Sequence, residues 1–245
     1  MTKHQNWFQS WFDTPYYHIL YKQRNEKEAQ GFMKNLIAHL NTTEDQTILD
    51  LACGKGRHSI FLNSLGYDVT GVDLSEQSIL EASKSCNERL KFMIHDMRSP
   101  LNVKYDLILN MFTSFGYFDS VEDNFKVLKT IKNSLNKNGI AVIDFMNSNY
   151  VINHLVPKNS VEIDGIHFEI KRNFKNGIIS KTIDVLDKVE IKHFKEQVRA
   201  FNRSDFIEMI SNANLNFVEC FGSYDLEPYS PQTSERLILI FKNNV

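Results

Sequence analysis

The feature that most constrains the fold is an alternation of short apolar segments with helical patterns between residues 46 and 150. Apolar runs suited to strands occur at 47–52, 67–73, 90–95, 105–112 and 140–146, with helical segments between most of them. Strands that alternate with helices and read as continuous apolar runs form a parallel sheet covered on both faces. Two further strand patterns follow at 216–221 and 236–242. The sequence therefore predicts an α/β fold with a doubly wound, mostly parallel, seven-stranded sheet and helices on both faces.

Two segments with a different pattern flank this core. Residues 1–45 are rich in aromatic side chains and predict an N-terminal helical lid. Between 160 and 200 the turn signals Asp164-Gly165 and Asn176-Gly177 predict an antiparallel β insert. Residues 201–245 then supply the last helix and the C-terminal strands of the core.

The insert has an apolar face that must be buried. Its apolar positions alternate with charged ones, among them Lys181, which we expect to point outward. We predict that the apolar face covers the carboxyl edge of the main sheet and forms the wall of an acceptor pocket, with a second copy of the chain as the alternative.

Composition excludes several classes of protein. The 245 residues carry 28 Lys+Arg against 30 Asp+Glu, a net charge of −2, which gives no basic field for a nucleic acid. The longest purely aliphatic run has four residues, 140–143, too few to span a membrane. The polar N-terminus and three cysteines without a CxxC pair favour a cytoplasmic protein without a zinc site. We therefore expect no nucleic acid, membrane or metal partner.

The segment 48–59, ILDLACGKGRHS, carries the chemistry. A strand ends in a glycine turn, and a helix follows whose first N–H groups are free to bind a ligand. The next strand ends in Asp73, 17 residues after Gly56, where a carboxylate can accept both hydroxyls of a ribose. Asp50, at the end of the first strand, repels a pyrophosphate but favours an ammonium group. The pattern also lacks the Gly-Lys-Ser/Thr of a phosphate-binding loop.

These residues resemble a known family. D-x-A-x-G-x-G at 50–56 and GVDLS at 71–75 are similar to the first motifs of class I S-adenosylmethionine-dependent methyltransferases, and HDMR at 95–98, YDLILN at 105–110 and LNKNGI at 135–140 resemble later ones in order. The sequence departs from the family pattern at Ala52 and Arg57, where the family has glycine. The resemblance implies S-adenosyl-L-methionine as cofactor. The cofactor-binding candidates it implies are Asp50, Ala52, Cys53, Gly54, Gly56, Arg57, Asp73, Leu74, Asp96, Met97, Asn110 and Tyr21.

The sequence signals for acceptor binding are less specific than those for cofactor binding. Aromatic and basic residues near the expected methyl group are substrate-binding candidates: Tyr16, Tyr17, Phe112, Phe115, Tyr117 and Arg199. Arg24 and Arg57 are further candidates for a carboxylate, and His58, His95 and His154 for a base. No catalytic residue is predicted, because in-line transfer from a sulfonium requires alignment and exclusion of water more than a base.

The leading interpretation is a methyltransferase for a small-molecule acceptor, as a monomer or homodimer. The alternatives are an RNA or protein methyltransferase, a nicotinamide-dependent oxidoreductase, which Asp50 disfavours, and a cofactor-binding protein without chemistry.

Overall fold

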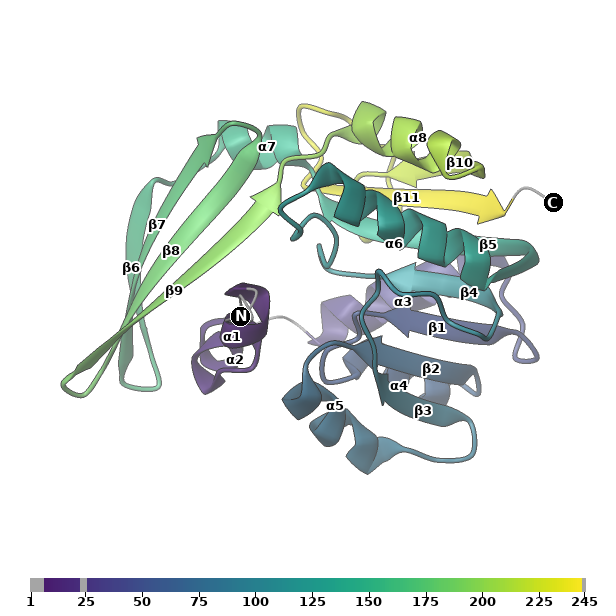
Figure 1. Cartoon of the computed structure of the whole chain (residues 1–245), viewed down its shortest axis with the longest axis horizontal. Helices are drawn as coiled ribbons and strands as arrows, with labels where there is room; N and C mark the ends of the chain where they lie inside the picture. The colour runs from purple at the N-terminus through teal and green to yellow at the C-terminus, as the bar shows by residue number, and fades with distance from the viewer. Residues whose placement is uncertain (1–6, 23–25, 244–245) are drawn as a thin grey trace, which may run out of the picture.

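A mixed seven-stranded sheet forms the centre of the protein (Figure 1), whose computed structural model describes residues 7–22 and 26–243. The strand order is β10-β11-β5-β4-β1-β2-β3. Neighbouring strands among β1–β5 pair in parallel, and β11 is antiparallel to both β5 and β10. The strands are β1 Thr47–Leu51, β2 Asp68–Asp73, β3 Leu90–Ile94, β4 Tyr105–Asn110, β5 Leu135–Met146, β10 Leu215–Phe221 and β11 Arg236–Asn243. The predicted seven-stranded, mostly parallel sheet is confirmed.

Helices cover both faces of this sheet. On one face α6 (Val121–Ser134) and α8 (Arg203–Asn212) pack against alternate strand residues such as Leu49 and Ile108. On the other face α3 (Glu26–Leu40) and α4 (Arg57–Ser64) pack against Ile48 and its neighbours. The remaining helical segments of the core are α5 (Glu76–Ala82), the 3₁₀ turn Ser83–Ser85 and α7 (Ser148–Asn153). Two apolar layers thus enclose the sheet, as the continuous apolar strands predict.

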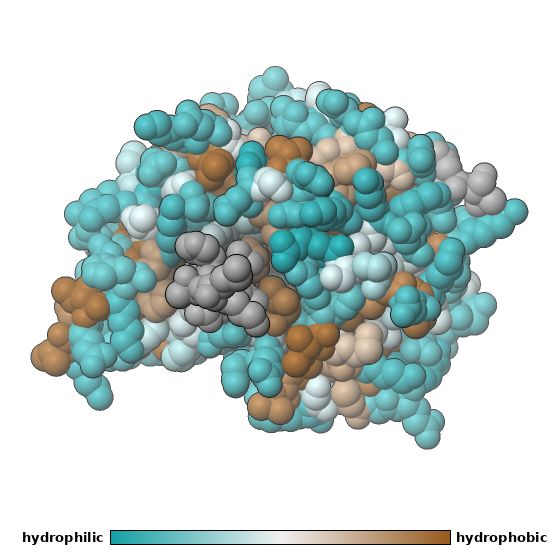
Figure 2. Space-filling view, viewed as in Figure 1, coloured by the Kyte–Doolittle hydropathy of each residue, from teal (hydrophilic) through white to brown (hydrophobic). Residues whose placement is uncertain are grey.

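A second, antiparallel sheet stands beside the core. It contains β6 Lys158–Ile163, β7 Ile166–Lys175, β8 Ile178–Asp187 and β9 Glu190–Arg199, in sequence order. Two of its turns are at Asp164-Gly165 and Asn176-Gly177, as predicted, and a third, without glycine, places Lys188 at φ 57°. Apolar surface gathers at the far tip of this sheet (Figure 2), where Val189 is 93% exposed.

The aromatic N-terminal segment forms two short helices, α1 (Trp7–Phe12) and α2 (Pro15–Leu20), between the second sheet and the core (Figure 1). They bury the inner face of the second sheet. The buried residues of this contact are Trp11, Tyr16, Phe168, Ile170, Ile183 and Val185. This differs from both arrangements expected for the insert, because the chain covers the apolar face with its own helices.

Lys181 also differs from expectation. It lies on the inner face of β8 with Ile179, Ile183 and Val185, because residues two apart on a strand share a face. It stands opposite Glu196 on β9, and its side chain is only 15% exposed.

A buried ion pair ties the loop after β4 to the sheet. Asp144 on β5 is fully buried and pairs with Arg236 on β11 at 2.6 Å. Its Oδ2 accepts the Phe112 N–H at 3.0 Å, and its main-chain carbonyl accepts the Thr113 N–H at 2.8 Å. Phe112 and Thr113 have φ of 57° and 59°, a conformation that costs non-glycine residues about 1–3 kcal/mol each. The network around Asp144 therefore holds a strained turn in place.

We predict that Asp144→Asn destabilises the protein by about 3–5 kcal/mol, because it leaves the Arg236 guanidinium buried without its counter-charge. Urea unfolding followed by circular dichroism measures the change. Asp164→Asn is the matched control, since Asp164 pairs with Lys22 at 2.9 Å on the surface and its loss should cost less than about 1 kcal/mol. Equal costs for the two variants would contradict a structural role for the buried pair.

Candidate functional site

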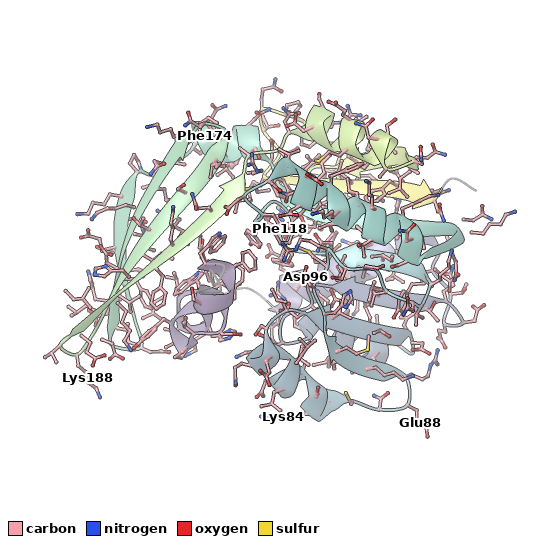
Figure 3. All side chains as sticks on the ribbon, in the orientation of Figure 1. Lys84, Glu88, Asp96, Phe118, Phe174 and Lys188 are labelled. Atoms are coloured by element: carbon pink, nitrogen blue, oxygen red, sulfur yellow. The ribbon has the colours of Figure 1, made fainter. Side chains whose placement is uncertain are left out.

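A cavity of about 330 Å³ lies at the carboxyl ends of β1, β2 and β4, beneath α1 and α2. Asp96 and Phe118, two of its wall residues, lie in the space between these helices and the core (Figure 3). Most of the predicted site residues line the cavity: Asp50, Ala52, Cys53, Gly54, Arg57, Asp73, Leu74, Asp96, Met97, Tyr17, Tyr21, Phe112 and Tyr117. The volume is in the range of small-molecule sites.

The two glycines of the turn after β1 have different functions. A Cβ on Gly54 would meet no atom within 4 Å, and Gly54 lines the cavity. A Cβ on Gly56 would lie 2.5 Å from the Phe92 ring, so Gly56 is required by packing against β3. Both residues have positive φ, as does Ala52 at 65°. Gly54 therefore leaves open space in the cavity wall, whereas Gly56, predicted to bind cofactor, is not among the cavity residues.

Asp73 ends β2 and fixes the loops around it. Its Oδ2 accepts the Gly54 N–H and its Oδ1 the Ser75 N–H, both at 2.8 Å. Burial raises the pKa of Asp73, an effect that these two hydrogen bonds only partly offset. The nearby carboxylate of Asp13, which contacts the Ser75 hydroxyl, adds to the increase in pKa. The Asp73 carboxylate is thus an acceptor oriented by backbone groups at the mouth of the glycine turn.

Asp50 is the most unusual group in the wall. It is 1% exposed, and its Oδ2 accepts the Ser59 hydroxyl at 2.6 Å. Burial raises its pKa from 3.8 to about 6, although the Ser59 hydrogen bond works in the opposite direction. Because the folded-state pKa is raised, ionisation of Asp50 costs stability as the pH rises from about 4 to 6. The full cost, about 3 kcal/mol, applies at pH 7. A carboxylate kept beside a cavity at such a cost makes Asp50 a candidate for binding a cationic group.

Asp96 follows β3 and is paired with Arg98. The Arg98 guanidinium binds both carboxylate oxygens at 2.5–3.1 Å and stacks over Phe118, 4.5 Å from the ring centroid. Burial raises the pKa of Asp96, but the Arg98 hydrogen bonds and charge outweigh it, so that its pKa is lowered and it is ionised at pH 7. Leu74 and Met97, beside it in the wall, are apolar.

The floor of the cavity is aromatic. The guanidinium of Arg57 lies 3.9 Å from the Phe112 ring centroid, and His58 stacks on the same ring at 5.2 Å. Burial, together with the charge of Arg57, lowers the pKa of His58 to about 3, so His58 is neutral at pH 7. Its Nε2 accepts a hydrogen bond from Arg57 Nε at 3.3 Å, and this atom is therefore already engaged.

The other candidate bases differ in position. His95 lines the cavity and its Nε2 bonds to the Ser99 carbonyl at 2.9 Å. His154 bonds to the Tyr150 carbonyl at 2.8 Å and is not a wall residue. Arg24, a candidate for a carboxylate, lies outside the described residues.

Four further predicted residues are placed away from the cavity. Asn110 is fully buried and donates to the Leu51 carbonyl at 2.8 Å. Phe115 is fully buried against Phe206, while Tyr16 donates to Asp187 at 2.9 Å on the second sheet. Arg199 donates to the carbonyls of Phe118 and Asp119 and so anchors the end of β9 to the loop after β4. Asn110, Phe115 and Tyr16 lie in segments that reach the cavity, but core packing or the second sheet sets their side-chain directions, whereas Arg199 ends β9, which does not reach it.

Some wall residues were missed by the sequence interpretation: Phe8, Phe12, His18, Glu26, Lys55, Ser75, Ser78, Met111, Ser114 and Phe118. The spacing of Phe8 and Phe12, and of Tyr17 and Tyr21, is the four-residue period of one helix face and could have indicated the first two. The polar members carry no comparable signal, because their place in the wall depends on tertiary packing.

Metal clusters and membrane-spanning helices are both absent from the described residues. No group of three or more His, Cys, Asp or Glu side chains among them could hold a metal ion. Of the helices in residues 7–22 and 26–243, none is both long and apolar enough to cross a membrane.

Comparison with known sequences shows which proteins the region around the glycine turn resembles. The family described as a methyltransferase domain matches residues 48–139. A putative methyltransferase, YqeM of Bacillus subtilis, is 31% identical over 121 residues, which are 48% of this chain and 49% of that protein. A glycine/sarcosine N-methyltransferase of Aphanothece halophytica is 28% identical over 140 residues, 55% of this chain and 51% of the relative. The chain thus spans about half the length of these two curated relatives.

Comparison with solved structures extends over nearly the whole chain. A methyltransferase from Clostridium acetobutylicum superposes with a TM-score of 0.79 at 22% identity, over 94% of this chain and 96% of its own. DesVI of Streptomyces venezuelae gives 0.68 at 19% identity, over 93% and 97%. At these identities the likeness shows the shared fold. The family match at 48–139 identifies a methyltransferase domain there, and the shared fold supports the resemblance to the class I S-adenosylmethionine-dependent methyltransferases.

Proposed function

We propose that the protein transfers a methyl group from S-adenosyl-L-methionine to a small-molecule acceptor by in-line displacement. The observation that carries this proposal is the Asp73 carboxylate, oriented by the N–H groups of Gly54 and Ser75 at the edge of the cavity. A carboxylate in this place suits the two hydroxyls of a ribose. The open wall at Gly54 leaves room for the ligand to lie against the backbone.

The remaining wall residues supply matching chemistry for the cofactor. Leu74 and Met97 offer apolar contact for an adenine, and the ionised Asp96 can accept a hydrogen bond from its amino group. The buried Asp50 offers negative charge for the ammonium group of the methionine part. When bound, S-adenosyl-L-methionine supplies a sulfonium methyl group, and the residues of the chain position that group.

The aromatic residues of the wall suit the reacting end. Tyr17, Phe112 and Tyr117 present ring surface to the cavity, and aromatic faces attract cations such as a sulfonium. They also exclude water, which competes with the acceptor as a nucleophile. Because its pKa is lowered to about 3, His58 is a weak base, and its Nε2 is engaged by Arg57, so we assign it no role as base.

A small acceptor is supported by the roof that α1 and α2 place over the cavity. The net charge of −2 disfavours a nucleic acid. Two relatives are named for amine acceptors: the glycine/sarcosine N-methyltransferase and a dTDP-amino-sugar N,N-dimethyltransferase of Streptomyces venezuelae, 29% identical over 42% of this chain and 44% of its own. We therefore propose a small molecule with a nucleophilic amine as the acceptor class.

Calorimetric titration of the purified protein with S-adenosyl-L-methionine, and separately with NAD, tests the cofactor. We expect binding of the first alone. Asp73→Ala should weaken it about 10- to 150-fold, because charge-assisted hydrogen bonds worth about 1.5–3 kcal/mol are lost. Asp68→Ala, at the opposite end of β2, is the control and should leave the affinity unchanged. Binding of NAD but not of S-adenosyl-L-methionine would refute the proposal.

Gly54→Val should abolish measurable cofactor binding, because its side chain would occupy the space where the ligand approaches. Gly165→Val is a matched control. Gly165 also has positive φ (76° against 56°), and a Cβ there would likewise meet no atom within 4 Å, but it lies in a turn of the second sheet. Each variant should lose about 1–3 kcal/mol of stability from backbone strain. If both bind the cofactor equally well, the ligand does not pass Gly54.

Binding should also depend on pH through Asp50. Below its pKa of about 6 the free site holds a proton that a cationic group must displace. The affinity for S-adenosyl-L-methionine should therefore fall by up to about tenfold per unit as the pH drops from about 6 to 5, and level off above about 6.5. Calorimetry across this range measures the slope. Asp50→Asn should flatten it, and a slope unchanged in that variant would assign the titration to another group.

A further inference from the structure

The second sheet does not itself line the cavity. Among the described residues, no member of β6–β9 contributes to the wall. The sheet instead packs against α1 and α2, where Trp11 and Tyr16 are buried on its inner face. Other residues of the same segment, Phe12 and Tyr21 among them, line the cavity. The sheet can therefore influence the site through these helices.

A charged pair lies beside the buried apolar residues of the inner face. Lys181 Nζ and Glu196 Oε2 are 3.4 Å apart on adjacent strands, with side chains 15% and 16% exposed. The neighbouring cross-strand pair on the same face, Ile183 and Phe194, is apolar. Removing two charges from water is costly, and apolar residues of similar volume often give equal or greater stability at such a position. Stability alone therefore does not account for the pair.

The contacts that Lys181 and Glu196 make with the N-terminal segment explain the presence of the pair better than stability does. Glu196 Oε1 accepts hydrogen bonds from the Trp11 indole N–H at 2.6 Å and from the Tyr21 hydroxyl at 2.7 Å. Lys181 donates to the same Tyr21 hydroxyl, and its Nζ lies 4.5 Å from the Tyr21 ring centroid. One residue of α1 and the C-cap residue of α2 are thus bound at a single point of the sheet.

We propose that Glu196 and Lys181 are positioning residues that fix Trp11 and Tyr21, and through them the helical wall of the cavity. Hydrogen bonds are directional, whereas apolar contacts allow short helices to slide or rotate on a sheet. The pair therefore selects one position of α1 and α2, in which Tyr21 faces the cavity. The consequence for cofactor binding rests on the proposed function, but the effect on the helices does not.

The test replaces the pair by apolar residues and follows Trp11. In a Trp7→Phe background, Trp11 is the remaining tryptophan, and its fluorescence reports the contact with Glu196. The variant Lys181→Met/Glu196→Leu is compared with Asp184→Asn/His193→Gln, which neutralises a cross-strand pair on the outer face of the same two strands. Thermal unfolding, acrylamide quenching of Trp11 and calorimetry with S-adenosyl-L-methionine are measured for both.

We expect the inner-face variant to remain folded, with a somewhat lower melting temperature because the Trp11 indole N–H loses its acceptor, with Trp11 more accessible to acrylamide and with cofactor affinity lowered about tenfold. The outer-face control should match the parent in all three. Loss of affinity in a variant that is fully folded at the temperature of the titration separates a positioning role from a structural one. Parent-like quenching and affinity in the folded inner-face variant would overturn the proposal.

Two further measurements keep the outcome decisive. If the double variant does not fold, Glu196→Gln retains one acceptor but loses the charge, and should show a smaller change in the same direction; unchanged quenching would again overturn the proposal. If the parent protein does not bind S-adenosyl-L-methionine, the proposed function fails. Acrylamide quenching of Trp11 still decides whether the pair positions the helices.

Discussion

Two left-handed turns at the carboxyl edge of the sheet, each tied by a carboxylate from a neighbouring strand, determine the shape of the cavity. After β1, the Gly54 N–H is bound by Asp73 at the end of β2. After β4, the Phe112 N–H is bound by Asp144 on β5, which Arg236 neutralises. In both turns a neighbouring parallel strand supplies the acceptor, so the sheet itself fixes the loops. The part of the wall that these two loops form is therefore held in place by the pairing of these strands.

The same geometry concentrates negative charge around the cavity. Asp50, Asp73 and Asp96 lie at or just beyond the ends of β1, β2 and β3, and all three line the wall. The pKa of Asp96 is lowered by its partner Arg98, whereas burial raises the pKa of Asp73 and, despite the nearby charge of Arg57, that of Asp50. A cationic ligand would relieve the cost of ionising the two buried carboxyls. S-adenosyl-L-methionine carries two positive groups, an ammonium and a sulfonium, and so fits this electrostatic pattern without a metal ion.

The sequence predicted the parts of the structure that local patterns determine. Periodicity and turn residues identified the strands of the core, the first two hairpins of the second sheet and the helix that Ser75 caps. It could not distinguish Gly54 from Gly56, because only the position of Phe92 on β3 shows which glycine is needed for packing. For a related reason, the sequence could not show that the side chains of Tyr16 and Arg199 lie away from the cavity. Their direction depends on contacts with Asp187 and with the loop after β4, which are far away in the sequence.

The helical wall shows how far the site depends on such distant contacts. Helices α1 and α2 have six residues each, and isolated helices of that length are not stable in water. They gain stability by burying Trp11 and Tyr16 on the second sheet, and their aromatic neighbours pack on Phe118 and Tyr117 of the loop after β4. The wall therefore forms only where the two sheets and the β4 loop are already in place. An insert that contributes no wall residue among those described can in this way still determine what the cavity accepts.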